Sequence, residues 1–107
     1  GGQADTAIGA QNSRNGRSFI ALYSTAMVKN PETGEREEIS KIVTMLKPGA
    51  AVTLSRNDVD KVVTEYGVAD LRGTNIDERV ERLIAIAHPK FREMLRKEAI
   101  QTGIIAG

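Results

Sequence analysis

The 107-residue chain has the composition of one small globular domain, with 40% hydrophobic and 27% charged residues. Its formal net charge of +1 and its interleaved acids and bases argue against nucleic acid as a partner. Because it has no cysteine and a single histidine, disulfides, thiolate or histidine metal clusters and a cysteine nucleophile are excluded within this chain. No apolar stretch reaches the roughly 20 residues that a membrane helix needs.

The first part of the chain predicts a short helix, a strand and a loop. Asp5 is a favoured capping residue, so residues 5–13 are expected to form the helix. An Asn15-Gly16 turn follows, and residues 18–25 (SFIALYST) have the composition of a buried strand. The charged segment at residues 29–38 is interpreted as a solvated loop.

Three more strands are predicted before residue 75, where the spacing of the apolar residues changes. They cover residues 39–46 (ISKIVTML), 51–56 (AVTLSR) and 60–67 (DKVVTEYG), and ADLRG follows closely at residues 69–73. Connections this short favour antiparallel hairpins or a mixed sheet, because parallel strands need crossovers of a dozen residues or more.

From residue 75 onward, the hydrophobic period predicts two helices. Asn75 and Glu78 occupy the N-cap and N3 positions of a capping box, and His88-Pro89 separates the first helix from the second, which ends at Gly103. The chain is therefore expected to be an α/β fold in which two C-terminal helices pack on a mixed sheet. The expected apolar faces are Ile76, Val80, Leu83, Ile84 and Ala87, then Phe91, Met94, Leu95 and Ala99.

The glycine pair at the start of the chain is one candidate for chemistry. The backbone N–H groups of Gly1 and Gly2 could converge on a phosphate or a developing oxyanion, since no Cβ obstructs a close approach. The residues themselves leave a second interpretation open, in which the pair is a flexible terminus or a cloning remnant.

Glu65 is a second candidate, because it follows an apolar strand and precedes a glycine. A carboxylate at a strand end can line a cleft, and the alternative is a surface glutamate paired with an arginine. His88 is interpreted as a capping or core residue, and no Gly-x-Ser-x-Gly elbow surrounds Ser24.

Five stretches stand in a specific order and spacing: GGQAD (1–5), SKIV (40–43), PGAAVTLSR (48–56), VVTEYGVADLRG (62–73) and ERLIAIAHPKFREML (81–95). Together they resemble the C-terminal end of the acetyl-CoA hydrolase/transferase family, from Gly1 to about Arg96. Within it, the chain is most similar to the 4-hydroxybutyrate CoA-transferases and the butyryl-CoA:acetate CoA-transferases.

This resemblance implies that residues 1–107 are the last part of the second of two related α/β domains, with the active site between them. The upstream domain and the catalytic glutamate would then lie outside this chain. Gly1 and Gly2 match the glycine loop of the family, which implies an oxyanion-stabilising role, and Gln3 is implied to contact the substrate. Glu65 matches the Thr-Glu-x-Gly segment near the active site, so the resemblance implies a support residue and not the nucleophile.

The implied activity is transfer of CoA between an acyl-CoA (4-hydroxybutyryl-, butyryl- or acetyl-CoA) and a carboxylic acid such as acetate, through a glutamyl-CoA thioester. The CoA thioester is a substrate, and no bound cofactor or metal is expected. The resemblance further implies a cytoplasmic homo-oligomer in which this chain needs the rest of the polypeptide to be active. Acyl-CoA hydrolysis and a non-catalytic binding or assembly module stay open as alternatives. Two departures from the family pattern, Thr6 and Lys61, bear on substrate preference.

Overall fold

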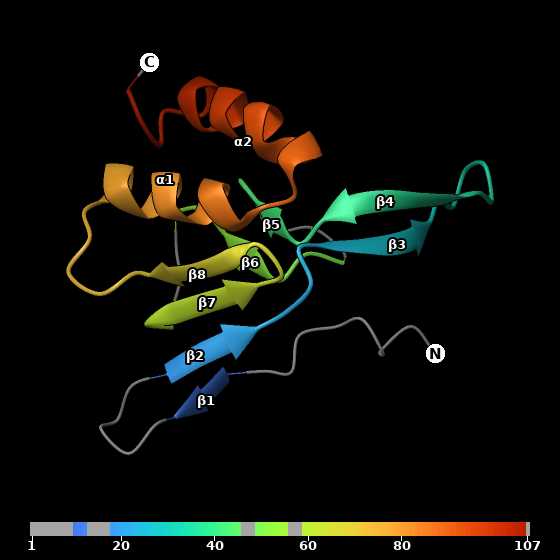
Figure 1. The fold of residues 1–107 in the computed structure, drawn as a ribbon. Helices are drawn as coiled ribbons and strands as arrows, with labels where there is room; N and C mark the ends of the chain where they lie inside the picture. The colour runs from blue at the N-terminus through green and yellow to red at the C-terminus, as the bar shows by residue number, and fades with distance from the viewer. Residues whose placement is uncertain (1–9, 13–17, 46–48, 56–58, 107) are drawn as a thin grey trace.

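The computed structural model describes residues 10–12, 18–45, 49–55 and 59–106, which form eight strands and two helices (Figure 1). In chain order these are β1 (Ala10–Asn12), β2 (Ser18–Ala21), β3 (Thr25–Lys29), β4 (Arg36–Ser40), β5 (Ile42–Val43), β6 (Val52–Thr53), β7 (Lys61–Thr64), β8 (Gly67–Asp70), α1 (Ile76–Ile86) and α2 (Pro89–Gln101).

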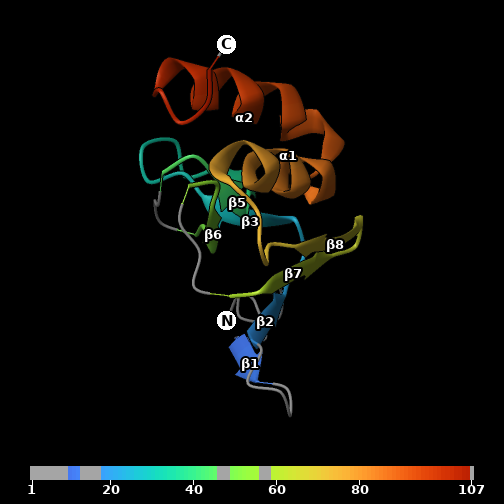
Figure 2. The same cartoon turned by 90° about the vertical axis from the view of Figure 1, so that its left-hand side faces the viewer.

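The central sheet is mixed and has the strand order β1-β2-β7-β8. Strands β2 and β7 run parallel, with Ile20 opposite Val62, whereas the β1–β2 and β7–β8 pairs are antiparallel. Two smaller sheets stand beside it: the antiparallel β3–β4 hairpin, which projects from the body, and the parallel β5–β6 pair (Figures 1 and 2). The predicted α/β architecture, a mixed sheet with two C-terminal helices, is confirmed.

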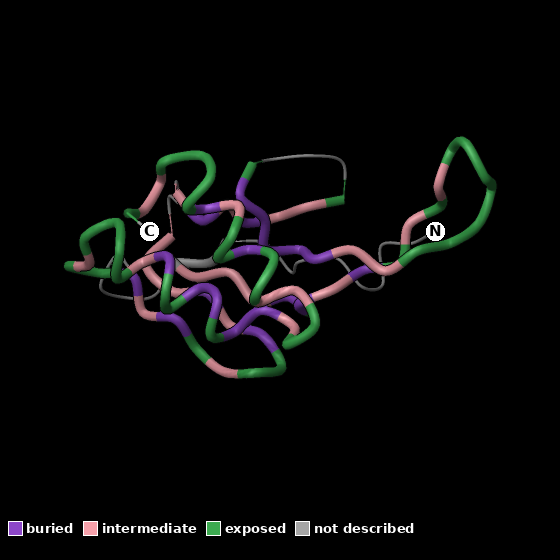
Figure 3. Tube along the Cα trace, turned by 90° about the horizontal axis from the view of Figure 1, so that it is seen from above, coloured by how far each residue is buried: buried purple, intermediate pink, exposed green. Residues whose placement is uncertain are grey.

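The core lies between the sheet and the helices. Helix α1 packs on β7 and β8, and α2 packs on α1, so the buried positions gather under the two helices (Figure 3). Burial of this apolar surface is the main force that holds sheet and helices together. The fully buried side chains with 0% exposure include Ile42, Leu54, Val62, Val80, Leu83 and Leu95.

The predicted capping box begins α1. The Asn75 Oδ1 atom accepts a hydrogen bond from the Glu78 backbone N–H at 2.8 Å, and Glu78 Oε1 accepts one from the Asn75 backbone N–H at 3.0 Å. The expected apolar face is correct at Val80, Leu83 and Ile84 but wrong at its start, because Ile76 is 47% exposed. The face begins one turn later, and the first turn of α1 lies past the end of β8 (Figure 1).

Replacing Asn75 by alanine is expected to lower the free energy of unfolding by about 1 kcal/mol, because the N3 backbone N–H loses its acceptor. Urea denaturation of the two chains measures the difference. Asn75→Ser, which restores an accepting oxygen at the N-cap, should recover most of the loss. Equal stability of the alanine and wild-type chains would contradict a capping role.

In the first 40 residues, one sequence prediction is wrong and another is right only in part. Residues 10–12 form strand β1 and not the end of a helix; the rest of the predicted helix, residues 5–9 and 13, lies outside the described residues. The charged segment at residues 29–38 is a solvated connection at residues 30–35, as predicted, but its ends, residue 29 and residues 36–38, belong to β3 and β4, which pair from Thr25–Ser40 to Lys29–Arg36. Asn30 closes the turn by accepting hydrogen bonds from the N–H groups of residues 32 and 33.

Candidate functional site

The β7–β8 turn presents Glu65 at the end of a buried strand. Thr64 pairs with Gly67, so only two residues, Glu65 and Tyr66, connect the strands. Gly67 has φ of +142°, a conformation that residues with a Cβ rarely adopt, which explains the glycine in TEYG. The Thr64 hydroxyl donates to the Ile86 carbonyl oxygen at 2.6 Å and thereby ties this turn to the end of α1.

The Glu65 carboxylate is held by one residue from another strand. Its Oε1 accepts a hydrogen bond from the Ser24 backbone N–H at 2.8 Å, and its Oε2 accepts one from the Ser24 hydroxyl at 2.9 Å. Ser24 is completely buried and lies just after β2, whereas Glu65 is exposed and lies just after β7. Because β2 and β7 are parallel, both residues stand at the carboxyl ends of adjacent strands, where α/β proteins commonly bind ligands.

These contacts keep the Glu65 carboxyl group ionised. Loss of surrounding water acts to raise its pKa, but hydrogen bonds from its own backbone N–H and from Ser24, with the charge of His88, outweigh that effect. The pKa of Glu65 is therefore lower than that of an ordinary glutamate. An ionised carboxylate whose two oxygens already accept hydrogen bonds is suited to holding neighbouring groups in place.

An aromatic wall stands beside Glu65. The Tyr66 and His88 rings meet edge to face with centroids 5.6 Å apart, and Phe91 follows His88 at 6.2 Å. The Arg92 guanidinium lies 5.4 Å from the centroid of the Tyr66 ring, within the range of a cation–π contact. His88 also caps α2, since its Nδ1 accepts from the Lys90 backbone N–H, as the sequence predicted.

The predicted site residues fall in two groups. Gly1, Gly2 and Gln3 lie outside the described residues, so their expected roles stay predictions. Glu65 is where the sequence predicted it, at a strand end, but its partner is Ser24 and not an arginine. Sequence reasoning missed Ser24, because nothing in the spacing connects residues 24 and 65; its place after an apolar strand is the one local signal.

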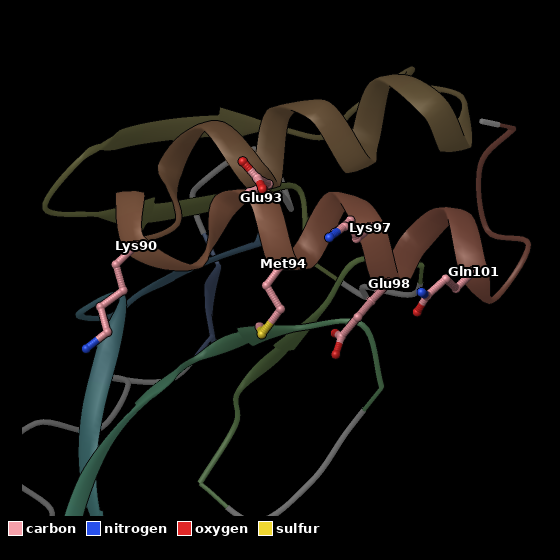
Figure 4. A pocket seen from close by; sticks show the side chains of 6 residues that line it. All are labelled: Lys90, Glu93, Met94, Lys97, Glu98 and Gln101. Atoms are coloured by element: carbon pink, nitrogen blue, oxygen red, sulfur yellow. The ribbon is translucent and has the colours of Figure 1, made fainter.

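A separate hollow of about 490 Å³ runs along the outer side of α2 (Figure 4). Its charged side chains are partly engaged already: Lys90 pairs with Glu38 at 2.8 Å, and Glu98 accepts a hydrogen bond from the Thr44 hydroxyl. The hollow is lined by Lys90, Glu93, Met94, Lys97, Glu98 and Gln101.

The described residues contain no group of three or more histidine, cysteine, aspartate or glutamate side chains arranged to hold a metal ion. Neither of the described helices is long and apolar enough to cross a bilayer.

Comparison with known protein families assigns the chain to one of them. The sequence model of the acetyl-CoA hydrolase/transferase C-terminal domain matches residues 1–99. The chain belongs to this family. Residues 1–99 include the glycine pair, Ser24, Glu65 and the aromatic wall, so every candidate site residue lies inside the region shared with the acetyl-CoA hydrolase/transferase family.

Curated relatives in the acetyl-CoA hydrolase/transferase family support the resemblance seen in the sequence. The 4-hydroxybutyrate coenzyme A transferase of Clostridium kluyveri is 49% identical over 98 residues, which are 92% of this chain and 21% of that protein. The butyryl-CoA:acetate CoA-transferase of Anaerostipes caccae is 42% identical over 99 residues, again 92% of this chain and 21% of the relative. The chain thus spans about a fifth of the length of these relatives.

A solved structure supports the same family fold. The 4-hydroxybutyrate CoA-transferase of Porphyromonas gingivalis matches with a TM-score of 0.58 and 46% identity, covering 84% of this chain and 20% of that one. The fold of the described residues is therefore that of a C-terminal segment of a CoA-transferase.

Proposed function

We propose that this chain is the C-terminal part of the second α/β domain of a longer CoA-transferase. The transferase moves CoA between an acyl-CoA, such as 4-hydroxybutyryl-, butyryl- or acetyl-CoA, and a carboxylic acid such as acetate. The observation that carries the proposal is the family match over residues 1–99, with relatives named for this reaction at 42–49% identity.

The proposed reaction proceeds through a covalent intermediate on a glutamate upstream of this chain. That carboxylate attacks the thioester carbonyl and expels CoA thiolate, which forms an acyl-glutamyl anhydride. The thiolate then attacks the glutamyl carbonyl, releases the first acid and forms a glutamyl-CoA thioester, which an acceptor carboxylate opens in the reverse sequence. Covalent catalysis divides one difficult exchange into easier steps.

Within this scheme Glu65 is a support residue. Both of its oxygens accept hydrogen bonds from Ser24 and its pKa is lowered, so its lone pairs are less available for attack on a carbonyl. Gly1 and Gly2 supply backbone N–H groups to the oxyanion of each tetrahedral intermediate, and Gln3 contacts the substrate. One oxyanion donor typically contributes about 2.7–4 kcal/mol to the stabilisation of such a transition state.

Transfer of labelled acetate into acetyl-CoA tests the proposal. We expect no turnover from the 107-residue chain alone and CoA transfer from the full-length polypeptide, because the nucleophile belongs to the upstream part. Turnover by the isolated chain would mean that a nucleophile lies within it, and Glu65 would be the first residue to examine. No transfer by the full-length protein would overturn the proposed function.

The family description also covers acyl-CoA hydrolysis, in which water and not an acid opens the glutamyl intermediate. Measuring acetyl-CoA formation and free CoA thiol from butyryl-CoA, with and without acetate, separates the two reactions. A transferase forms acetyl-CoA only when acetate is present and releases no net CoA thiol, whereas a hydrolase releases CoA thiol in both conditions. We further propose a cytoplasmic homo-oligomer, which sedimentation of the full-length protein and fractionation of the cells would test.

A further inference from the structure

Lys41 is a buried charged residue that the proposed reaction has not yet used. It connects β4 to β5 and is only 5% exposed. Its backbone is fully engaged: the N–H donates to the Ser24 carbonyl oxygen at 2.8 Å, and the carbonyl oxygen accepts from the N–H groups of Ala51 and Val52 at 2.9 and 3.1 Å. The position of this residue is therefore fixed from two sides.

The bond to Ser24 places Lys41 directly beside the Glu65 site. It continues the β3–β4 ladder by one step beyond the Thr25–Ser40 pair, so Lys41 stands opposite Ser24. Residues in opposite positions of an antiparallel pair have neighbouring Cβ atoms. The N–H of Ser24 does not bond back to Lys41 but is donated to Glu65, so the end of this ladder and the Glu65 carboxylate form one cluster.

The Lys41 ammonium group is unpaired within the part of the chain that the structure describes. Within residues 10–12, 18–45, 49–55 and 59–106, no hydrogen bond or ion pair is made by its Nζ atom, and the three ion pairs of that part join other residues. Its Nζ atom is not among the enclosed side-chain atoms without a partner, of which Arg79 Nε is the single case in the described residues, so the buried stem leads to an ammonium that reaches the surface. An unpaired ammonium at the surface beside the Glu65 site is open to a negative group from elsewhere.

We propose that the Lys41 ammonium binds the carboxylate of the acid substrate in the CoA-transferase. The inference rests on the proposed function, which consumes and releases a carboxylic acid. A single compact ammonium carries one charge, which matches one small carboxylate. The phosphates of CoA carry several charges, for which one lysine with a buried stem is a poor site.

Steady-state kinetics of the full-length enzyme test this role. Lys41→Gln should raise KM for acetate by about tenfold or more and leave kcat at saturating acetate and KM for acyl-CoA nearly unchanged, since a charge-assisted bond made in every bound state is lost. Lys41→Arg, which keeps the charge, should recover much of the affinity. Lys29→Gln is the matched control, because Lys29 is an exposed lysine of the same hairpin.

Ligand-dependent melting gives a readout that needs no turnover. Acetate should raise Tm of the wild-type full-length protein more than acetamide does, and the difference should disappear in Lys41→Gln. Lys41→Arg, which keeps the charge, should keep part of the difference and shows whether Lys41 carries it if Lys41→Gln does not fold. Adenosine 3′,5′-bisphosphate represents the phosphates of CoA in a parallel series.

Three results would overturn the inference while the wild-type enzyme still transfers CoA. The first is loss of the bisphosphate effect in Lys41→Gln with the acetate effect intact, which would assign Lys41 to CoA. The second is a large fall in ligand-free Tm with unchanged KM values, which would assign it to a carboxylate of the protein. The third is equal protection of the wild type by acetate and acetamide. A wild-type protein without transfer activity would instead refute the proposed function.

Discussion

Glu65→Gln in the proposed full-length CoA-transferase is expected to lower kcat/KM for CoA transfer by about 10- to 100-fold. The substitution keeps the size of the side chain, and the Ser24 hydroxyl can rotate to accept from the new amide, so the local structure should survive. What disappears is the negative charge that the Ser24 N–H and hydroxyl stabilise. Steady-state kinetics measure the loss, and Glu32→Gln, in the exposed tip of the β3–β4 hairpin, is the control.

Ser24→Ala tests the same contact while the charge is kept. Removing one hydrogen bond to the ionised form should move the lowered pKa of Glu65 back toward its ordinary value, so the acid limb of the pH–rate profile should shift to higher pH. Glu65 stabilises the fold above its unfolded pKa, near 4.5, and that contribution is lost as pH falls through the lower folded value. The stability difference between wild type and Ser24→Ala should therefore close in acid. Wild-type kinetics and pH dependence in both variants would show that Glu65 plays no part in the reaction.

Local signals in the sequence predict the elements that frame this site. The capping box at Asn75 and Glu78 and the His88-Pro89 break locate both helices, since each depends on residues within one turn of each other. In TEYG the sequence pattern predicts one strand through residue 67, whereas β7 ends at Thr64 and Gly67 takes the positive φ of the β7–β8 turn. A resemblance to known family motifs then adds a functional role to Glu65, which its local sequence alone leaves open.

Contacts between distant segments are what the sequence does not predict. Ser24 and Glu65 are 41 residues apart, and they meet because β2 and β7 pair in parallel across the segments that form β3 to β6. The pairing of β3 with β4 was not predicted, because a run of charged residues favours a solvated loop. Cross-strand pairing of these residues can offset that preference. The burial of Lys41 was not predicted either, because it depends on the strands around this residue and not on its neighbours in SKIV.

Leu83→Ala is expected to have the largest effect on stability, lowering the free energy of unfolding by about 2–5 kcal/mol. Leu83 is 0% exposed in the core cluster under the two helices, so truncation removes buried apolar surface and leaves a cavity that the packed elements fill poorly. A loss of this size is a large share of the total stability of a small domain. Urea denaturation of the 107-residue chain, followed by far-UV circular dichroism, measures it.

Ile76→Ala on the same helix is the matched comparison. The sequence pattern places Ile76 and Leu83 on one apolar face, whereas the structure leaves Ile76 47% exposed at the first turn of α1. The structure therefore predicts a change within about 0.5 kcal/mol for Ile76→Ala, as for an ordinary surface substitution. Similar large losses in both variants would mean that α1 packs along its whole length, as the sequence pattern alone suggests, and that its first turn lies against the sheet.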